Sequence, residues 1–175
     1  WQYQLQGDLD VSELVDAFSA DLFAVTRNNV NTLHANGARV ICHVSAQFES
    51  FRPDADAFAA VAIGNFVSGR RDERFADITH PSVLNVMSQR ILTAKQKGCD
   101  AVAFHNVDLW EHSETGFNTT FEQMYSFLTF LSDGCHAKGV AIALVNGAAQ
   151  SDDLVSLFDL AITERCFELG VCAEY

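Results

Sequence analysis

Three times in this chain, a helix-like segment ends at a glycine that is followed closely by a short apolar run. The three junctions are Asn36-Gly37-Ala38-Arg39, Lys97-Gly98-Cys99-Asp100 and Lys138-Gly139-Val140. A glycine just past a helix is a common C-cap because it adopts a left-handed conformation without strain. Repeated helix-to-strand junctions are typical of β/α units, so they predict a parallel sheet that is buried on both faces.

Apolar and β-branched runs between these junctions predict the strands, and periodic apolar segments predict the helices. The expected strands cover residues 1–5, 22–26, 39–45, 101–106, 140–146 and 160–166, with a weaker seventh at 74–78. The expected helices cover residues 28–36, 82–97 and 120–138. Thr120 and Gln123 have the spacing of a capping box at the start of the third helix.

The composition fits one globular domain that spans residues 1–175. Of the 175 residues, 49% are hydrophobic and only 2 are proline, with no linker or charge block between the expected elements. No run of about 18 apolar residues occurs, so we expect no membrane span. A net charge of -12 repels phosphate backbones, which makes nucleic acid a poor partner.

A parallel sheet can close into a barrel or remain open and doubly wound. No Gly-x-Gly-x-x-Gly motif or P-loop follows an expected strand, which weakens the case for a nucleotide-binding open sheet. Polar residues instead gather where the expected strands end: Ser45, His105, Asn106, Asp108, Asn146 and Glu164. A ring of polar strand ends is typical of the active face of a TIM barrel.

Five cysteines in a chain of this length favour an oxidising compartment. Cys166 and Cys172 lie in one short loop, and we expect them to form a disulfide. A second bridge could join two of Cys42, Cys99 and Cys135, or these could be buried thiols. The glycosylation sequon Asn118-Thr119-Thr120 also agrees with export, so we expect a secreted or otherwise extracytosolic protein.

Short segments along nearly the whole chain carry a resemblance to a known family. They include Trp1-Gln2-Tyr3-Gln4-Leu5, Val40-Ile41-Cys42-His43-Val44-Ser45-Ala46, Glu73-Arg74-Phe75-Ala76-Asp77-Ile78, Lys97-Gly98-Cys99-Asp100-Ala101-Val102 and Glu164-Arg165-Cys166-Phe167-Glu168. In their order and spacing these segments resemble glycoside hydrolase family 114. The resemblance implies a TIM barrel and an activity like that of the best-known members, which are endo-α-1,4-polygalactosaminidases.

The sequence departs from the family pattern at the expected site. After Cys-Asp-Gly/Ala-Val the family reads Glu-Pro-Asp-Asn-Val-Asp, whereas this chain reads Ala103-Phe104-His105-Asn106-Val107-Asp108. The presumed catalytic aspartate of the family is therefore His105, while the second presumed carboxylate is retained as Glu164. The next strand, which ends Leu-Lys-Asn-Asp in the family, reads Leu144-Val145-Asn146-Gly147.

These departures bear on activity because glycoside hydrolysis needs two carboxyl groups that flank the bond. Strand alternation places Ala103 and His105 on the side that faces the barrel lumen, so the lumen loses negative charge. We expect a degenerate, non-hydrolytic barrel that serves as a glycan-binding or structural subunit. The alternative is an active polygalactosaminidase whose cationic substrate is attracted by the charge of -12.

The candidate catalytic residues are Glu164, His105 and, as a possible replacement carboxylate, Asp108. The candidate sugar-binding residues are Trp1, Asp21, His43, Ser45, Asn106, Trp110 and Asn146. The aromatic side chains could stack on sugar rings or simply pack, and His105 could simply fill the lumen and bond His43 or Glu164. No cofactor or metal is expected, because the polar residues near His105 lack a recognised zinc spacing.

The number of expected strands predicts an incomplete barrel. A TIM barrel usually takes about 250 residues and eight strands, and seven strands are expected here. The fold prediction is therefore an α/β, TIM (β/α)8-type barrel that is short of its last strand–helix unit. Because exposed strand edges are seldom left bare, we expect another protein chain, or a further segment of this one, at the open barrel edge.

Overall fold

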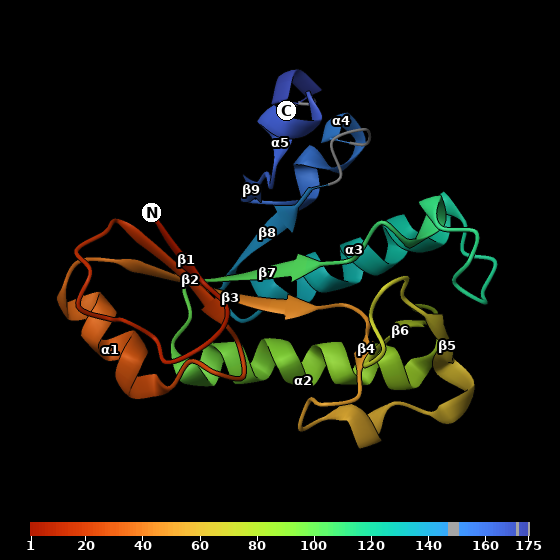
Figure 1. The fold of residues 1–175 in the computed structure, drawn as a ribbon, viewed down its shortest axis with the longest axis horizontal. Coiled ribbons are helices and arrows are strands. Elements are labelled where there is room, and N and C mark those ends of the chain that lie inside the picture. Colours follow the sequence, from red (N-terminus) through yellow and green to blue (C-terminus); the bar gives the residue numbers. More distant parts are fainter. Residues whose placement is uncertain (147–150, 171, 175) are drawn as a thin grey trace.

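The computed structural model describes residues 1–146, 151–170 and 172–174 and contains a curled, parallel sheet of six strands (Figure 1). Across the sheet the order is β1 (Gln2–Gln4), β2 (Ala17–Asp21), β3 (Arg39–Ser45), β7 (Ala101–His105), β8 (Ala141–Val145) and β9 (Leu160–Ile162). Each strand is parallel to its neighbours. A curled sheet of this kind is a partial barrel, which confirms the predicted fold class.

Three long helices cover the convex face of the sheet: α1 (Arg27–Ala35), α2 (Pro81–Lys97) and α3 (Phe121–His136). The main core lies between these helices and alternate strand residues, such as Val40, Val102 and Ile142. The intervening residues form a second, smaller apolar cluster on the concave face: Ile41, Ala101, Ala103, Ala143, Val145 and Ile162. We call the space inside the curl the lumen.

The helix boundaries follow the local signals in the sequence. Thr26 begins α1 and Thr120 begins α3, each through a capping box, so the box predicted with Gln123 is confirmed. Gly98 ends α2 with a φ of 92°, in the left-handed region that glycine enters without strain. These short-range contacts explain why the three predicted helices are confirmed to within a few residues.

The strand predicted at residues 22–26 is wrong, because the chain forms β2 at Ala17–Asp21 instead. Leu22 and Val25 are buried, which is why the segment resembles a strand. However, the Asp21 carboxylate accepts hydrogen bonds from the backbone N–H groups of residues 23 and 24 at 2.9 and 3.0 Å. These bonds turn the chain directly after β2, and the apolar residues that follow pack as a connection into α1.

The seventh parallel strand, predicted at residues 74–78, is also wrong. β6 (Glu73–Ala76) pairs antiparallel with β4 (Phe48–Glu49) and β5 (Ile63–Phe66) in a separate three-stranded sheet near one end of α2 (Figure 1). The Arg74 side chain donates to the carbonyl oxygen of Gly64 at 2.7 Å and reinforces that pairing. An apolar run alone does not distinguish a barrel strand from an inserted antiparallel one.

The remaining elements are short helices in the connections. They are η1 (Ala55–Ala57), η2 (Ala60–Ala62), η3 (Leu109–Glu111), α4 (Ser151–Leu154), η5 (Val155–Leu157), α5 (Cys166–Leu169) and η6 (Cys172–Glu174). Within the described ranges, no helix has both the length and the apolar character needed to cross a bilayer.

The structure contains two disulfides. The predicted Cys166–Cys172 bridge is confirmed, and the question left open by the other three cysteines is answered by a Cys42–Cys99 bridge. This second bridge ties β3 to the residues just before β7. Cys135 is a free, buried thiol, and burial raises its pKa to about 12.

The two outer strands of the parallel sheet are β1 and β9. Among the described residues, no backbone ladder joins them, so the barrel is open at this edge. One side-chain contact spans the opening: the Tyr3 hydroxyl donates to the Glu164 carboxylate at 2.6 Å.

Candidate functional site

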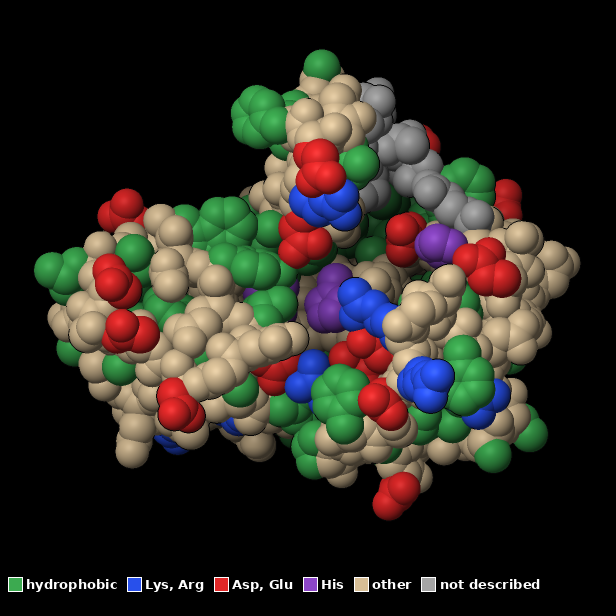
Figure 2. Space-filling view, viewed as in Figure 1, with side chains coloured by type: hydrophobic (Ala, Val, Ile, Leu, Met, Phe, Trp, Pro, Cys, Tyr) green, Lys and Arg blue, Asp and Glu red, His purple; other side chains and the backbone are tan. Residues whose placement is uncertain are grey.

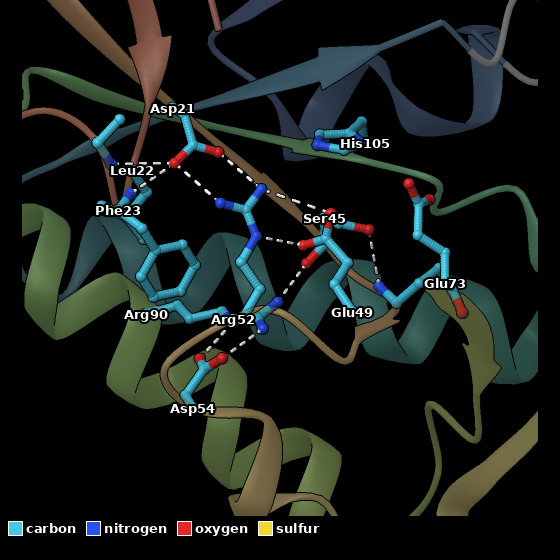
Figure 3. Close-up of polar contacts among 12 residues, drawn as sticks. Asp21, Leu22, Phe23, Ser45, Glu49, Arg52, Asp54, Glu73, Arg90 and His105 are labelled. Carbon is cyan, nitrogen blue, oxygen red and sulfur yellow. Dashed lines mark hydrogen bonds and ion pairs between the residues drawn. The ribbon is translucent and has the colours of Figure 1, made fainter. Parts of the chain in front are cut away.

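The polar side chains that the sequence places after the strands gather at one rim of the curled sheet. Asp21 ends β2, Ser45 ends β3 and His105 ends β7. The parallel register aligns Ser45 with His105 and Asp21 with His43. Figure 3 shows Asp21, Ser45 and His105 at this rim. In the space-filling view, histidine side chains occupy a hollow at the middle of this face, with acidic and basic groups around it (Figure 2).

Two asparagines turn the chain at this rim. Asn106 and Asn146 directly follow β7 and β8, and their φ angles of 58° and 59° lie in the left-handed region, which asparagine tolerates better than most residues. The Asn106 amide donates to Ser45 Oγ at 3.1 Å. The Asn146 amide oxygen accepts the backbone N–H of Glu164 at 2.9 Å. Both side chains therefore fix neighbouring strand ends relative to one another.

His43 is a buried imidazole without a hydrogen-bond partner. Its side chain points into the lumen, the residue is 1% exposed, and neither ring nitrogen has a partner among the described residues. The Tyr3 ring packs edge-on against it at 5.0 Å between centroids, and the His105 ring lies 6.5 Å away. Burial, helped by His105 and opposed by Glu164, lowers the pKa of His43 to about 4, so the ring is neutral at pH 7.

His105 is neutral for a similar reason. Burial lowers its pKa, while the carboxylates of Glu164, Glu73 and Asp21 act in the opposite direction. The expectation that His105 bonds His43 or Glu164 is wrong, since its Nδ1 lies 3.1 Å from the Asn106 amide nitrogen. The left-handed turn brings that amide onto the ring, and because an amide NH₂ only donates, the ring proton is on Nε2.

Glu164 is the retained carboxylate of the family pattern, and it lies exposed at the mouth of the lumen. It accepts the Tyr3 hydroxyl at 2.6 Å and the Asn146 amide at 3.4 Å. Burial of the phenol, together with the hydrogen bond and charge of Glu164, raises the pKa of Tyr3. Tyr3 is therefore protonated at neutral pH and acts as a hydrogen-bond donor to Glu164.

A cluster of paired charges lies beside the histidines, and we call it the ion-pair cluster (Figure 3). Its members are Asp21, Glu49, Arg52, Asp54 and Arg90. Arg52 bridges the carboxylates of Asp21 and Glu49, each at 2.7 Å. Arg90 binds both oxygens of Asp54 at 2.7 and 2.8 Å and the Ser45 carbonyl at 2.6 Å. Asp21, predicted to bind sugar, thus lies inside a salt-bridged network.

Sequence reasoning missed Glu73 as a site residue. Glu73 lies on β6 of the inserted sheet, where its side chain is 12% exposed and pairs with Arg70 at 2.7 Å. In Figure 3 it points toward the His105 side of the rim, and it is one of the carboxylates whose charge acts on that ring. The only signal in the sequence was its place in a family-like segment, Glu73-Arg74-Phe75.

The other candidates separate into two groups. Trp1 is 60% exposed, donates to Ser19 Oγ on β2 at 3.0 Å, and packs edge-on against Tyr3 at 5.9 Å. Trp110 instead packs against Phe121 of α3 at 5.7 Å. Asp108, the possible replacement carboxylate, lies 3.7 Å from His112 in the turn after β7. Trp1 thus belongs to the mouth, whereas the contacts of Trp110 and Asp108 are with the η3 region and α3.

Two further predictions from the sequence concern a metal site and the replacement at Gly147. In the part of the chain that the structure describes, no three histidine, cysteine, aspartate or glutamate side chains are grouped to hold a metal ion. Gly147, which replaces an aspartate of the family pattern, lies outside the described residues.

Comparison with known proteins places this arrangement in a family. The sequence model of glycoside-hydrolase family GH114 matches residues 1–175. A comparison with curated protein sequences finds no match. Among solved structures, Aspergillus fumigatus Ega3 in complex with galactosamine is similar with a TM-score of 0.95 and 29% identity, over 100% of this chain and 70% of that one.

More distant structures share the fold alone. The glycoside hydrolase domain of PelA from Pseudomonas aeruginosa has a TM-score of 0.68 at 14% identity, over 93% of this chain and 65% of that one. Eubacterium rectale Amy13B has a TM-score of 0.62 at 10% identity, over 86% of this chain and 41% of that one. With a family match along its entire length, the chain belongs to glycoside hydrolase family GH114.

Proposed function

We propose that this domain binds α-1,4-linked galactosamine polymers at the mouth of its partial barrel and does not hydrolyse them. The ligand class is supported by membership of GH114 and by the 29% identity with Ega3, which was solved in complex with galactosamine. The aromatic rings of Trp1 and Tyr3, 60% and 42% exposed at the mouth, are suited to stacking on sugar faces.

One observation carries the proposed loss of hydrolysis: the strand that should end in the catalytic aspartate ends in the neutral imidazole of His105. Hydrolysis by this class of enzyme needs one carboxyl group as the acid and a second as base or nucleophile. A neutral imidazole cannot form the glycosyl ester and adds no negative charge beside an oxocarbenium ion. Loss of such a group removes several orders of magnitude of rate.

The electrostatics favour a cationic ligand. The chain carries a net charge of -12, and Glu164 places an exposed carboxylate beside the exposed aromatic rings. A carboxylate and an ammonium form a charge-assisted hydrogen bond, which is stronger than a neutral one.

A second function, hydrolysis with a displaced carboxylate, is favoured by the position of Glu73. The charges of Glu73, Glu164 and Asp21 act on His105, and of these three Glu73 and Glu164 lie outside the ion-pair cluster. In this alternative Glu73 takes the role of the missing aspartate. Its 2.7 Å pair with Arg70 holds the Glu73 carboxylate in place at the rim.

Affinity electrophoresis in gels containing α-1,4-galactosaminan, combined with a reducing-end assay on the same polymer, separates the two functions. We expect retardation of the wild-type protein without release of reducing ends. Release that Glu73→Gln abolishes would establish the displaced-carboxylate alternative. Absence of retardation in the wild-type protein, in gels that retard an active family member, would contradict the proposed ligand.

Restoring the missing carboxylates is a stricter test of whether their loss abolished hydrolysis. His105→Asp combined with Ala103→Glu returns the two carboxylates of the family pattern to β7. Gain of reducing-end release in this variant would show that the remainder of the mouth is competent. If release stays absent while binding persists, groups besides these two have been lost.

We also propose that the protein is exported through an oxidising compartment. The two disulfides and the exposed position of Asn118 in the sequon Asn118-Thr119-Thr120 support this location. After secretion from a eukaryotic host, peptide-N-glycosidase should lower the mass of the wild-type protein and leave Asn118→Gln unchanged. An identical mass before and after treatment of the wild-type protein would remove this support.

The open edge of the sheet leads to a further proposal, that another protein chain or a further segment of this one covers β1 and β9. It is supported by the free outer edges of both strands among the described residues. Hydrogen exchange of the full-length protein should show slow exchange of the β9 amides if the edge is covered. Fast exchange there, with slow exchange in β3 and β7, would contradict the proposal.

A further inference from the structure

Among the residues that the structure describes, His43 is the buried side chain whose polar atoms have no hydrogen-bond partner. The residue is 1% exposed, and neither ring nitrogen has a partner among the described residues. Leaving a buried polar group unpaired destabilises a fold, so packing alone does not account for an imidazole at this position.

The neighbours of His43 toward β7 and β8 are small. In the strand register its neighbour on β7 is Ala103, and the next residue across the sheet is Ala143 on β8. Both side chains are single methyl groups. The ring is covered instead by Tyr3, which packs on it edge-on at 5.0 Å.

Tyr3 packs on His43 and is itself partly exposed. The residue is 42% exposed, and its hydroxyl is joined to the Glu164 carboxylate at 2.6 Å. Glu164 is itself exposed, so an ammonium group in solution can compete with the phenol for its oxygen. The hydroxyl that binds Glu164 and the ring that packs on His43 belong to the same side chain.

The charges of His43 and Glu164 suit them to different chemical groups of a ligand. The pKa of His43 is lowered to about 4 by burial, so its neutral ring offers one N–H donor and one nitrogen acceptor. This pair of functions complements a hydroxyl, which also donates and accepts. An ammonium group only donates and therefore needs the carboxylate of Glu164.

We infer that an amino sugar binds at this mouth by exchange with Tyr3: its ammonium replaces the Tyr3 hydroxyl on Glu164, and one of its hydroxyls reaches the uncovered ring of His43. This inference rests on the proposed function and adds to it a separate role for each of three side chains. Glu164 selects the amine, His43 binds a hydroxyl that amino and neutral sugars share, and Tyr3 competes with the ligand for Glu164.

The test compares galactosamine oligomers with galactose oligomers of equal length by titration calorimetry at pH 7. His43→Phe keeps an aromatic ring and removes both nitrogens, so we expect about tenfold weaker binding of both oligomers and an unchanged ratio between them. Glu164→Gln should abolish most of the preference for the galactosamine oligomer. Tyr3→Phe removes the competing hydrogen bond and should strengthen binding of the galactosamine oligomer severalfold.

The outcomes separate this inference from the proposed function. If the wild-type protein binds neither oligomer, the proposed function fails. If the wild-type protein binds the oligomers, the proposed function stands. The exchange with Tyr3 is then wrong if His43→Phe binds as well as the wild-type protein, and also if Tyr3→Phe binds more weakly. Should His43→Phe fail to fold, the imidazole ¹⁵N resonances of the wild-type protein give the answer: His43 should shift on ligand addition, and an unchanged resonance at saturation overturns the inference.

Discussion

Two clusters of polar side chains lie next to each other at the carboxyl ends of the strands: the ion-pair cluster, and the histidine pair of His43 and His105. They differ in whether their buried polar groups have partners. In the ion-pair cluster, Arg90 is 1% exposed and binds both oxygens of Asp54. In the histidine pair, His43 is equally buried, but it is neutral and neither ring nitrogen has a partner among the described residues. A buried charge is tolerated only when it is paired, whereas a neutral ring can remain unpaired at a smaller cost.

The difference indicates separate roles for the two groups. The ion-pair cluster joins β2, the segment after β3 and helix α2, which fixes the rim on which the site is built. In the histidine pair, His43 contributes hydrogen-bonding capacity that the described residues do not use. Substitutions in the first group should therefore act on stability, and those in the second on binding.

The largest effect is expected from Arg90→Ala. Removal of this side chain leaves the Asp54 carboxylate and the Ser45 carbonyl without their partner, and breaking a buried pair costs about 3–5 kcal/mol. Urea denaturation should show the decrease in unfolding free energy. Arg70→Ala is the matched control, because Arg70 is 59% exposed and its pair with Glu73 should contribute under about 1 kcal/mol. Equal losses in the two variants would contradict a structural role for the cluster.

The two disulfides should differ in their contributions. Cys42 and Cys99 are 57 positions apart, so replacement of both by serine should lower the unfolding free energy by about 4 kcal/mol through loop entropy. The same change at Cys166 and Cys172, 6 positions apart, should cost about 2 kcal/mol. If the short bridge proves the more stabilising, loop entropy does not determine the ranking.

The pH dependence of stability should come from the histidine pair. In the unfolded chain His43 takes up a proton near pH 6.5, whereas the folded ring does so near pH 4. The unfolded state therefore binds more protons in this window, and the unfolding free energy should fall by up to about 3 kcal/mol as pH drops from 6.5 to 4. His105 acts in the same direction. His43→Phe should flatten part of this slope, and an unchanged slope would show that His43 is already protonated or exposed.

The smallest effect on stability is expected from Tyr3→Phe. The bond between Tyr3 and Glu164 lies at the open, partly exposed mouth, so its loss should cost under about 1 kcal/mol by thermal denaturation. A loss comparable to that of Arg90→Ala would mean that this contact closes the barrel edge, and Tyr3 could then not serve as a displaceable cover.

The sequence predicted those parts of the fold that depend on neighbouring residues. The helix ends at Gly98 and the capping box of Thr120 are short-range features, and the structure confirms them. The run at 22–26 was mistaken for a strand because its buried side chains satisfy the same hydrophobic pattern as β2. Only the hydrogen bonds accepted by Asp21 show that the chain has already turned.

The site was less predictable because its contacts join distant residues. Arg52 meets Asp21 across 31 positions and Arg90 meets Asp54 across 36, and no spacing rule links such pairs. The strand ends that carry Ser45, His105 and Asn146 could be found, since parallel strands place their carboxyl ends at one edge. Glu73 could not, because it reaches the rim from an inserted sheet.

The central claim, that a neutral imidazole at the end of β7 leaves a site that binds without cutting, is tested most directly by end-group analysis. Purified protein is incubated with α-1,4-galactosaminan whose own reducing ends have been chemically reduced. New reducing ends are then counted over a time course. We expect no release above that of the Glu164→Gln variant, from a preparation that is retained on the same polymer. Steady release by the wild-type protein that Glu164→Gln abolishes would contradict the claim.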